Sequence, residues 1–136
     1  MTHTGTEPGC IFCEKPIDER LFVSDYAFAC FDRHPVAFGH ILVIPTRHEA
    51  SWFALNRNEQ TSMLEILDRA KDYLDAHFSP DGYTIGVNEG ASAGQTVFHV
   101  HLHLIPRSLN DVEDPRGGIR GVIPGKQRYP TQTPDD

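Results

Sequence analysis

The stretch that decides the fold covers residues 98–106 and reads Phe98-His99-Val100-His101-Leu102-His103-Leu104-Ile105-Pro106. Its histidines alternate with apolar residues, and a period of two is typical of a β-strand, whose successive side chains point to opposite faces. We therefore expect the three histidines on one face, and the apolar residues from Phe98 to Leu104 on the other, towards a core. Neutral histidine can act as a base, nucleophile or metal ligand near pH 7.

The histidine triplet has three interpretations on these grounds alone. In the first, the three side chains lie on a polar surface and have no chemical role. In the second, they share one catalytic zinc ion, because alternating histidines of a strand can bind the same metal. In the third, the site is divided, so that one histidine binds a structural zinc and another acts as a nucleophile.

Two N-terminal cysteines bear on this choice. Cys10 and Cys13 form a C-x-x-C pair that follows a polar start with Gly and Pro, which favours a metal site over a redox motif between a strand and a helix. A closed zinc site needs four Cys or His ligands, and His48 and His99 are candidates for the other two. If His99 binds the metal, the other two histidines of the triplet remain free. The alternative is a pair of unliganded thiols.

The rest of the chain predicts an α+β fold with a mainly antiparallel sheet. Short strand-like runs occur at residues 21–24, 27–31, 40–45 and 83–87, and Asp25-Tyr26 is a candidate turn between the first two. Apolar residues at three-and-four spacing predict one long helix from Asn56 to Phe78, with Asn56 and Glu59 as a capping box. We expect residues 1–8 to be disordered, residues 9–128 to form a single domain, and residues 129–136 to form a polar tail.

Composition excludes several classes of function. The chain has 136 residues and a net charge of −7, which argues against binding a nucleic acid polymer through a basic surface. It has no apolar run long enough to cross a membrane and no features of a secretory signal, so we expect a cytoplasmic location. Its odd number of cysteines, three, argues against a disulfide framework, and Cys30 is best explained as a buried small hydrophobe.

The loop before the histidines has the composition of an anion site. Residues 88–96 contain Gly90, Gly94 and small side chains that let backbone N–H groups approach a ligand. Asn88, Gln95 and Thr96 add neutral hydrogen-bond donors. A flexible hairpin loop is the alternative, but the adjacent histidines favour the ligand site.

Several motifs of the chain resemble those of a known family. They are Cys10-Ile11-Phe12-Cys13, Phe31-Asp32, Gly39-His40-x-Leu42-Val43-Ile44-Pro45-x-Arg47-His48, Asn88-x-Gly90 and Gly94-Gln95-Thr96-Val97-x-His99-x-His101-x-His103-x-x-Pro106-Arg107. Their types, order and spacing resemble the histidine-triad (HIT) superfamily of nucleotide hydrolases and transferases, over residues 9 to 107. The segment Arg116-Gly117-Gly118 resembles the tail of some bacterial-type members.

The resemblance implies a role for each motif residue. The middle histidine of the triad, His101, is the implied nucleophile, and His103 contacts the phosphate. Gln95 and Asn88 position the phosphoryl group and the leaving group, and Asp32 binds the ribose hydroxyls. Further residues of the nucleotide site are His40, Thr96, Phe12 and Phe31. A structural zinc is implied on Cys10, Cys13, His48 and His99, and the family usually forms homodimers.

The function expected from this resemblance is hydrolysis at the α-phosphate of a dinucleoside polyphosphate or a nucleoside phosphoramidate, through a nucleotidyl-histidine intermediate. Gln95-Thr96 resembles the dinucleoside polyphosphate branch, whereas residues 108–136 match neither branch closely. Two alternatives remain. One is a zinc-dependent hydrolase with the three histidines on one catalytic metal, and the other is a nucleotide-binding regulatory module with little turnover.

Overall fold

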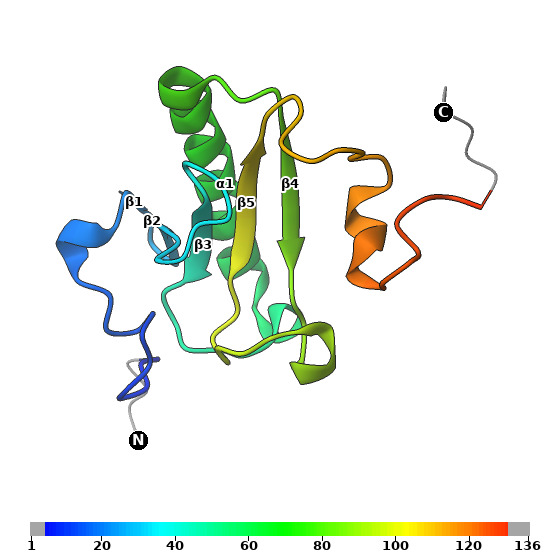
Figure 1. Cartoon of the computed structure of the whole chain (residues 1–136). Helices are drawn as coiled ribbons and strands as arrows, with labels where there is room; N and C mark the ends of the chain where they lie inside the picture. The colour runs from blue at the N-terminus through cyan, green and yellow to red at the C-terminus, as the bar shows by residue number, and fades with distance from the viewer. Residues whose placement is uncertain (1–4, 131–136) are drawn as a thin grey trace.

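A computed structural model describes residues 5–130, in which one helix packs on a single antiparallel sheet (Figure 1). The strands are β1 (Phe22–Val23), β2 (Ala27–Phe31), β3 (Ile41–Pro45), β4 (Gly82–Val87) and β5 (Leu102–Arg107), and the helix is α1 (Arg57–Phe78). The strand order is β1-β2-β3-β5-β4, and all neighbours are antiparallel. The α+β prediction is confirmed. Short 3₁₀ turns cover Ile17–Glu19, Trp52–Ala54, Ala91–Ala93 and Gly118–Val122.

The long helix begins and ends where the sequence predicts. The Asn56 side chain accepts a hydrogen bond from the Glu59 N–H, and the Glu59 carboxylate accepts one from the Asn56 N–H, both at 2.9 Å. This capping box satisfies two of the N–H groups that a helix start leaves unpaired. The helix ends at Phe78, before Ser79 in the left-handed conformation. Its inner face buries four apolar side chains completely: Met63, Ile66, Ala70 and Leu74.

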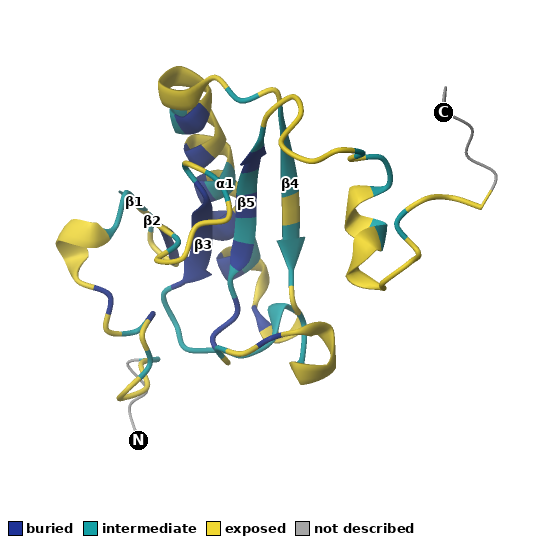
Figure 2. Ribbon diagram, in the orientation of Figure 1, coloured by how far each residue is buried: buried dark blue, intermediate teal, exposed yellow. Residues whose placement is uncertain are grey.

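The central strands and one side of the helix are the most buried parts of the chain (Figure 2), and the two faces of the sheet carry two separate apolar clusters. Alternate strand residues, such as Ala29, Val43 and Leu104, pack against the helix and form the larger core. The intervening residues Phe28, Cys30, Leu42 and Ile44 pack against Phe12 of the N-terminal segment and form the smaller one. Because the sheet has helix α1 on one face only, the second face is available for a binding site.

Gly39 allows the chain to enter β3 beside the helix end. Its φ is +85°, a conformation that L side chains rarely adopt, and a Cβ placed there would lie 2.8 Å from Cδ2 of Leu74. Only glycine fits this close approach without displacing the last buried turn of α1. The turn therefore sets where His40, the next residue, enters the sheet.

The histidine strand is shorter than its alternation predicts. β5 begins at Leu102, and residues 97–99 form a bend that precedes it. Val100, Leu102 and Leu104 are buried as expected, but the prediction that Phe98 faces the core is wrong, because its side chain is 50% exposed. The bend displaces Phe98 only, because Val100 is buried in the larger core with Leu102 and Leu104, and Phe12 of the second face contacts the rings of both His99 and His101.

The ends of the described chain contact the body to different extents. Glu7 is bonded to the N-terminal cysteine loop, because its N–H lies 3.3 Å from the Cys13 sulfur and its carbonyl accepts from Cys10 at 3.1 Å. Within residues 1–8, which we expected to be disordered, Glu7 is therefore bonded to the cysteine loop, and residues 1–4 lie outside the described residues. After β5, residues 112–130 leave the sheet on the β4 side (Figure 1). No helix within residues 5–130 is long and apolar enough to span a membrane.

Candidate active site and metal cluster

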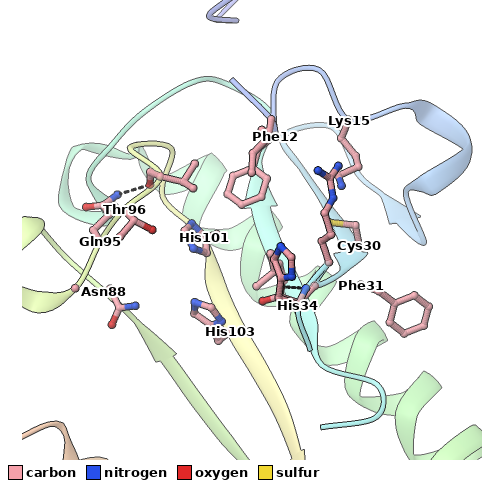
Figure 3. A pocket seen from close by; sticks show the side chains of 16 residues that line it. Phe12, Lys15, Cys30, Phe31, His34, Asn88, Gln95, Thr96, His101 and His103 are labelled. Carbon is pink, nitrogen blue, oxygen red and sulfur yellow. Dashed lines mark hydrogen bonds between the residues drawn. The ribbon is translucent and has the colours of Figure 1, made fainter. Parts of the chain in front are cut away.

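One pocket on the second face of the sheet gathers most of the residues that the sequence assigned to a nucleotide (Figure 3). Its lining includes Phe12, Phe31, Asp32, Asn88, Gln95, Thr96, His101 and His103. These residues come from four parts of the chain: the N-terminal loop, the end of β2, the end of β4 with its loop, and the histidine segment. The fold therefore brings predicted site residues that are up to 91 positions apart, from Phe12 to His103, into one pocket.

The register of the strands determines which residues lie side by side beneath this pocket. Cys30 pairs with Leu42, Leu42 pairs with His103, and His103 pairs with Gly86, so these residues form one row across β2, β3, β5 and β4. Adjacent strands lie about 4.8 Å apart, which separates Cys30 from His103 by about 10 Å. The row thus has an apolar end at Cys30 and a polar end at His103, with Asp32 following directly after β2.

The orientation of His101 is fixed by a backbone carbonyl. Nδ1 of His101 lies 2.9 Å from the carbonyl oxygen of His99. A carbonyl only accepts, so Nδ1 carries the hydrogen and donates it, and Nε2 of the neutral ring keeps a lone pair. The ring also packs edge-on against Phe12, with centroids 4.9 Å apart. This arrangement gives His101 one free nitrogen for nucleophilic attack.

His103 acquires the opposite tautomer through His40. The Val36 N–H donates to Nδ1 of His40 at 3.2 Å, so the hydrogen of the neutral His40 ring is on Nε2. That nitrogen lies 2.9 Å from Nδ1 of His103, which must accept. Nε2 of His103 therefore carries a hydrogen that it can donate to a ligand. His40, which we expected in the nucleotide site, is buried behind His103.

Burial keeps these rings neutral. Desolvation, together with the neighbouring His101 and His40, lowers the pKa of His103 to about 4. Desolvation also lowers the pKa of His40, although Asp32 opposes the shift. Near pH 7 both rings are uncharged, so the tautomers above are the forms that a ligand meets.

Asp32 keeps its carboxylate at the rim of the pocket. Its Oδ1 accepts the His34 N–H at 2.8 Å, and its Oδ2 lies 3.5 Å from Nε2 of His40. The Asp32 N–H donates to the His40 carbonyl at 2.9 Å, which ties this residue to the start of β3. A carboxylate held in this way retains lone pairs that can accept from two adjacent hydroxyl groups.

Gln95 supports the loop with its side chain. Its Oε1 accepts the Gly90 N–H at 2.9 Å, and its Nε2 donates to the carbonyls of Ala50 and Val97 at 2.8 and 3.2 Å. These bonds use both amide hydrogens, and the residue is 4% exposed. Gln95, which we expected to contact the phosphoryl group, therefore holds the small-residue loop of residues 88–96 in shape, and Asn88 and Thr96 remain as lining residues.

A second cluster joins the N-terminal loop to the histidine segment. Cys10, Cys13, His48 and His99 bring two sulfur and two nitrogen atoms within 4.8 Å of one another. Nδ1 of His99 lies 3.4 Å from Sγ of Cys10 and 3.5 Å from Sγ of Cys13, and Nδ1 of His48 lies 3.4 Å from Sγ of Cys13. All four residues that the sequence assigned to a metal are thus brought together, and the cluster could hold a metal ion.

The donor set and spacing of this cluster suit tetrahedral zinc. Nε2 of His99 donates to the Pro45 carbonyl at 2.7 Å, which leaves the lone pair on Nδ1, towards the sulfurs. Zn–S bonds of about 2.3 Å and Zn–N bonds of about 2.0 Å at tetrahedral angles separate N from S by about 3.5 Å. Burial lowers the pKa of His99 to about 4 and raises the pKa of Cys13.

An ion pair joins Arg47, the residue before His48, to the start of the helix. Arg47 donates to both oxygens of Glu59, at 2.8 and 3.0 Å, and Glu59 is the buried capping residue of α1. Arg47 lowers the pKa of Glu59, which keeps the carboxylate charged. The position of His48 is thereby tied to the start of the helix.

Two charged residues of the pocket, Lys15 and Arg33, were not predicted from the sequence. Lys15 lies beside Cys30 at the apolar end, and its side chain is 7% exposed. Nothing in its local pattern distinguishes it from a surface lysine, since the C-x-x-C pair before it already has its own explanation. Only the folding of the N-terminal segment over the sheet buries this side chain.

Comparison with known proteins identifies the family. The HIT domain family matches residues 15–110. A HIT family protein from Bacillus anthracis has 38% identity, a TM-score of 0.68, and 76% coverage of both chains. A zinc-bound histidine triad family protein from Mycobacterium smegmatis has 30% identity and a TM-score of 0.68, over 76% of this chain and 78% of that one.

Relatives with named activities are also similar. A bis(5'-adenosyl)-triphosphatase from Dictyostelium discoideum is 38% identical over 96 residues, which cover 71% of this chain and 64% of that protein. An asymmetrical bis(5'-nucleosyl)-tetraphosphatase from Schizosaccharomyces pombe is 33% identical over 76% of this chain and 57% of that protein. The match thus spans less than two thirds of these two relatives. The pocket, the strand order and the family match agree, and the chain belongs to the HIT family.

Proposed function

We propose that this HIT protein hydrolyses a dinucleoside polyphosphate or a nucleoside phosphoramidate at the α-phosphate, through a nucleotide bound covalently to His101. The observation that carries the proposal is the fixed tautomer of His101, whose Nδ1–H is bonded to a carbonyl and whose Nε2 is free in the pocket. The similarity to two enzymes named as dinucleoside polyphosphate hydrolases supports the substrate class.

The reaction has two displacements. In the first, Nε2 of His101 attacks the α-phosphorus, a P–N bond forms, and the bond from phosphorus to the leaving group breaks, with its electron pair going to the leaving group. In the second, water forms a new P–O bond, the P–N bond breaks, and a proton is released to solvent. The second displacement yields a nucleoside monophosphate and regenerates the neutral His101 ring, and the leaving group of the first displacement is the other product.

His103 and Asp32 bind the substrate in this scheme. The Nε2–H of His103, which His40 fixes in place from behind, donates to a non-bridging phosphoryl oxygen. A donor that is already oriented stabilises the developing charge without reorganisation. Asp32, at the rim, accepts from the ribose hydroxyls. Gln95 acts as a positioning residue through the loop that it holds, and Asn88 lines the pocket on the leaving-group side.

The metal cluster has a structural part in the proposal. Cys10, Cys13, His48 and His99 would hold zinc, which when bound cross-links the N-terminal loop to the segment before β5. The alternative of one catalytic zinc on His99, His101 and His103 finds less support, because His99 directs Nδ1 to the cysteines and Nε2 to the Pro45 carbonyl.

Turnover on a substrate panel tests the function. We expect the full chain to release a nucleoside monophosphate from dinucleoside tri- or tetraphosphates or from nucleoside 5'-phosphoramidates, and the preferred class identifies the leaving group. Zinc removal by chelation should lower the thermal midpoint along with activity. Immediate loss of activity with an unchanged midpoint would support a catalytic metal instead, and binding without turnover would support a regulatory module.

We also propose that the chain forms a homodimer through its β4 side. β4 is an edge strand, and its residue Ile85 is 47% exposed to solvent. Trp52, Phe53 and Leu64 line a largely apolar hollow with Val87 at the end of the same strand. Edge strands and apolar patches are features that a partner covers. Light scattering should give twice the chain mass, and Phe53→Glu should reduce it to one; a monomeric wild-type chain would contradict the proposal.

A further inference from the structure

We propose that Lys15 selects the base of the nucleotide and favours a 6-oxopurine, such as guanine, over adenine. The inference rests on the proposed function, because it takes a nucleotide as the ligand. It concerns a residue outside the histidine motif, and it starts from an ammonium group that lies in an apolar part of the pocket.

The Lys15 side chain is buried although it is charged. Only 7% of it is exposed, and it lies in the pocket with the apolar residues Phe12, Cys30 and Leu42 (Figure 3). Burying an ammonium group is unfavourable unless hydrogen bonds replace its water. A charged group in this place therefore indicates that something in the pocket accepts its hydrogen bonds.

The polar contact that the described residues offer to the ammonium is weak. Nζ of Lys15 lies 3.9 Å from Oε1 of Glu19, and the Glu19 side chain is 56% exposed. An ion pair this long and this open to solvent contributes little. Since an ammonium has three donors and no acceptor, hydrogen bonds remain to be made with a ligand.

The backbone of Lys15 is held in place for such a contact. Arg20 donates to the Lys15 carbonyl from Nε and from a terminal nitrogen, at 3.2 and 3.1 Å. The guanidinium of Arg20 in turn lies over the Phe28 ring, 4.0 Å from its centroid. The Lys15 N–H donates to the Phe12 carbonyl at 3.3 Å. Less conformational freedom is then lost when a ligand binds.

The position of Lys15 matches the base and not the phosphate. Cys30 lines the pocket on the same side as Lys15 (Figure 3), and it lies two strands from His103, at about 10 Å. In Figure 3, Lys15 and Cys30 are on one side of the pocket, and Asn88 and Gln95 are on the other. A nucleotide with its α-phosphate at His101 and its ribose at Asp32 would direct its base to the Lys15 end.

The chemistry of the base edges gives the preference. Guanine offers two adjacent acceptors, O6 and N7, which is the pair that lysine contacts in specific recognition of guanine. Adenine places the donor N6 amino group beside N7, and an ammonium makes no hydrogen bond with that group. A donor-only side chain at this end therefore favours bases with a 6-oxo group.

Calorimetric titration of the full, zinc-loaded chain with nucleoside monophosphates tests this inference, because these products bind without turnover. We expect GMP and IMP to bind about tenfold or more tightly than AMP, which corresponds to one charged hydrogen bond. IMP lacks the 2-amino group, so its similarity to GMP assigns the preference to the 6-oxo group.

Substitutions at Lys15 sharpen the test. Lys15→Met should weaken GMP and IMP to the level of AMP, and Lys15→Gln, whose amide can pair with N6 and N7 of adenine, should shift the preference towards AMP. Lys126→Met, at an exposed lysine after β5, is the matched control and should leave all three affinities unchanged. Circular dichroism and zinc content establish that each variant is folded.

The possible failures are separable. Equal binding of GMP, IMP and AMP by a wild-type chain that hydrolyses dinucleotides would overturn the base inference alone. An equal loss of all three affinities in Lys15→Met would also overturn it, because it would mean that Lys15 attracts the phosphate. Absence of both monophosphate binding and turnover would instead overturn the proposed function.

Discussion

His99 and His101 are separated by one residue, yet they belong to two clusters with opposite properties. His99 is completely buried, and its two nitrogens face the cysteine sulfurs and the Pro45 carbonyl. His101 lines an open pocket and has one nitrogen free. His99 has both nitrogens occupied within its cluster, whereas His101 keeps one nitrogen available to a ligand.

The difference shows that backbone groups decide what each histidine can do. The Pro45 carbonyl fixes the hydrogen of His99 on Nε2, the His99 carbonyl fixes that of His101 on Nδ1, and the Val36 N–H fixes that of His40 on Nε2. The same residue type is thereby suited to bind a metal, to act as a nucleophile or to relay a hydrogen bond. We expect substitutions in the pocket to change chemistry, and substitutions in the metal cluster to change stability.

His101→Ala should give the largest effect. Removal of the nucleophile should lower kcat by about 10⁴-fold or more, as for other covalent catalysts, while nucleoside monophosphate affinity changes little. His77→Ala, at an exposed histidine of α1, is the control and should keep full activity. A His101→Ala variant that retains more than a tenth of the activity would remove the distinction between the two clusters.

His103→Asn should have an intermediate effect on chemistry. It removes one oriented donor, so kcat should fall by about 10²–10³-fold, with a smaller change in the thermal midpoint than the cysteine variants give. Steady-state kinetics and thermal unfolding on the same preparation measure both quantities. An unchanged kcat would mean that His103 does not contact the reacting phosphoryl group.

Replacement of both Cys10 and Cys13 with alanine should act on stability. The wild-type chain should contain one zinc ion, and the double variant none, with a thermal midpoint lower by about 10 °C or more because metal binding is coupled to folding. Cys30→Ala removes a thiol from the smaller core and should keep the zinc. Metal analysis that finds no zinc in the wild-type chain would refute the assignment.

Acid should destabilise the fold in a way that depends on His103. Its folded pKa of about 4 is below its ordinary value of about 6.5, so the unfolded chain binds more protons between these values. The free energy of unfolding should therefore be greatest above about pH 6.5 and fall towards pH 4. Denaturant titrations between pH 7 and 5 should give a shallower dependence for His103→Asn, and the same slope as wild type in His77→Asn.

The sequence predicts the local elements of this fold well. The helix, its capping box and the five strands follow from apolar periodicity and from Asn56 and Glu59, because these signals lie within a few residues of one another. The pocket residues follow from the resemblance to the HIT superfamily, which assigns a role to each motif residue. The bend at residues 97–99 was not predictable in this way, because an alternation of apolar and polar residues does not reveal where the backbone leaves the sheet, and Phe98 was placed wrongly as a result.

The tautomers and the burial of Lys15 depend on contacts between distant parts of the chain. His40 reaches His103 across 63 positions, and His99 reaches Pro45 across 54. Gln95 uses its amide on Ala50, 45 positions away, and this bond turns an expected phosphate contact into a support of the loop. Such partners are fixed by tertiary packing, so no pattern in the sequence identifies them.

Trapping of the reaction intermediate tests the central claim most directly. The wild-type chain is mixed with a dinucleoside polyphosphate or phosphoramidate, quenched under conditions that preserve P–N bonds, and digested for mass spectrometry. The account predicts one added nucleoside monophosphate unit on the peptide with residues 99–103, located on His101 and absent from His101→Ala. An adduct on His103, or no adduct in a chain that turns over at full rate, would contradict it.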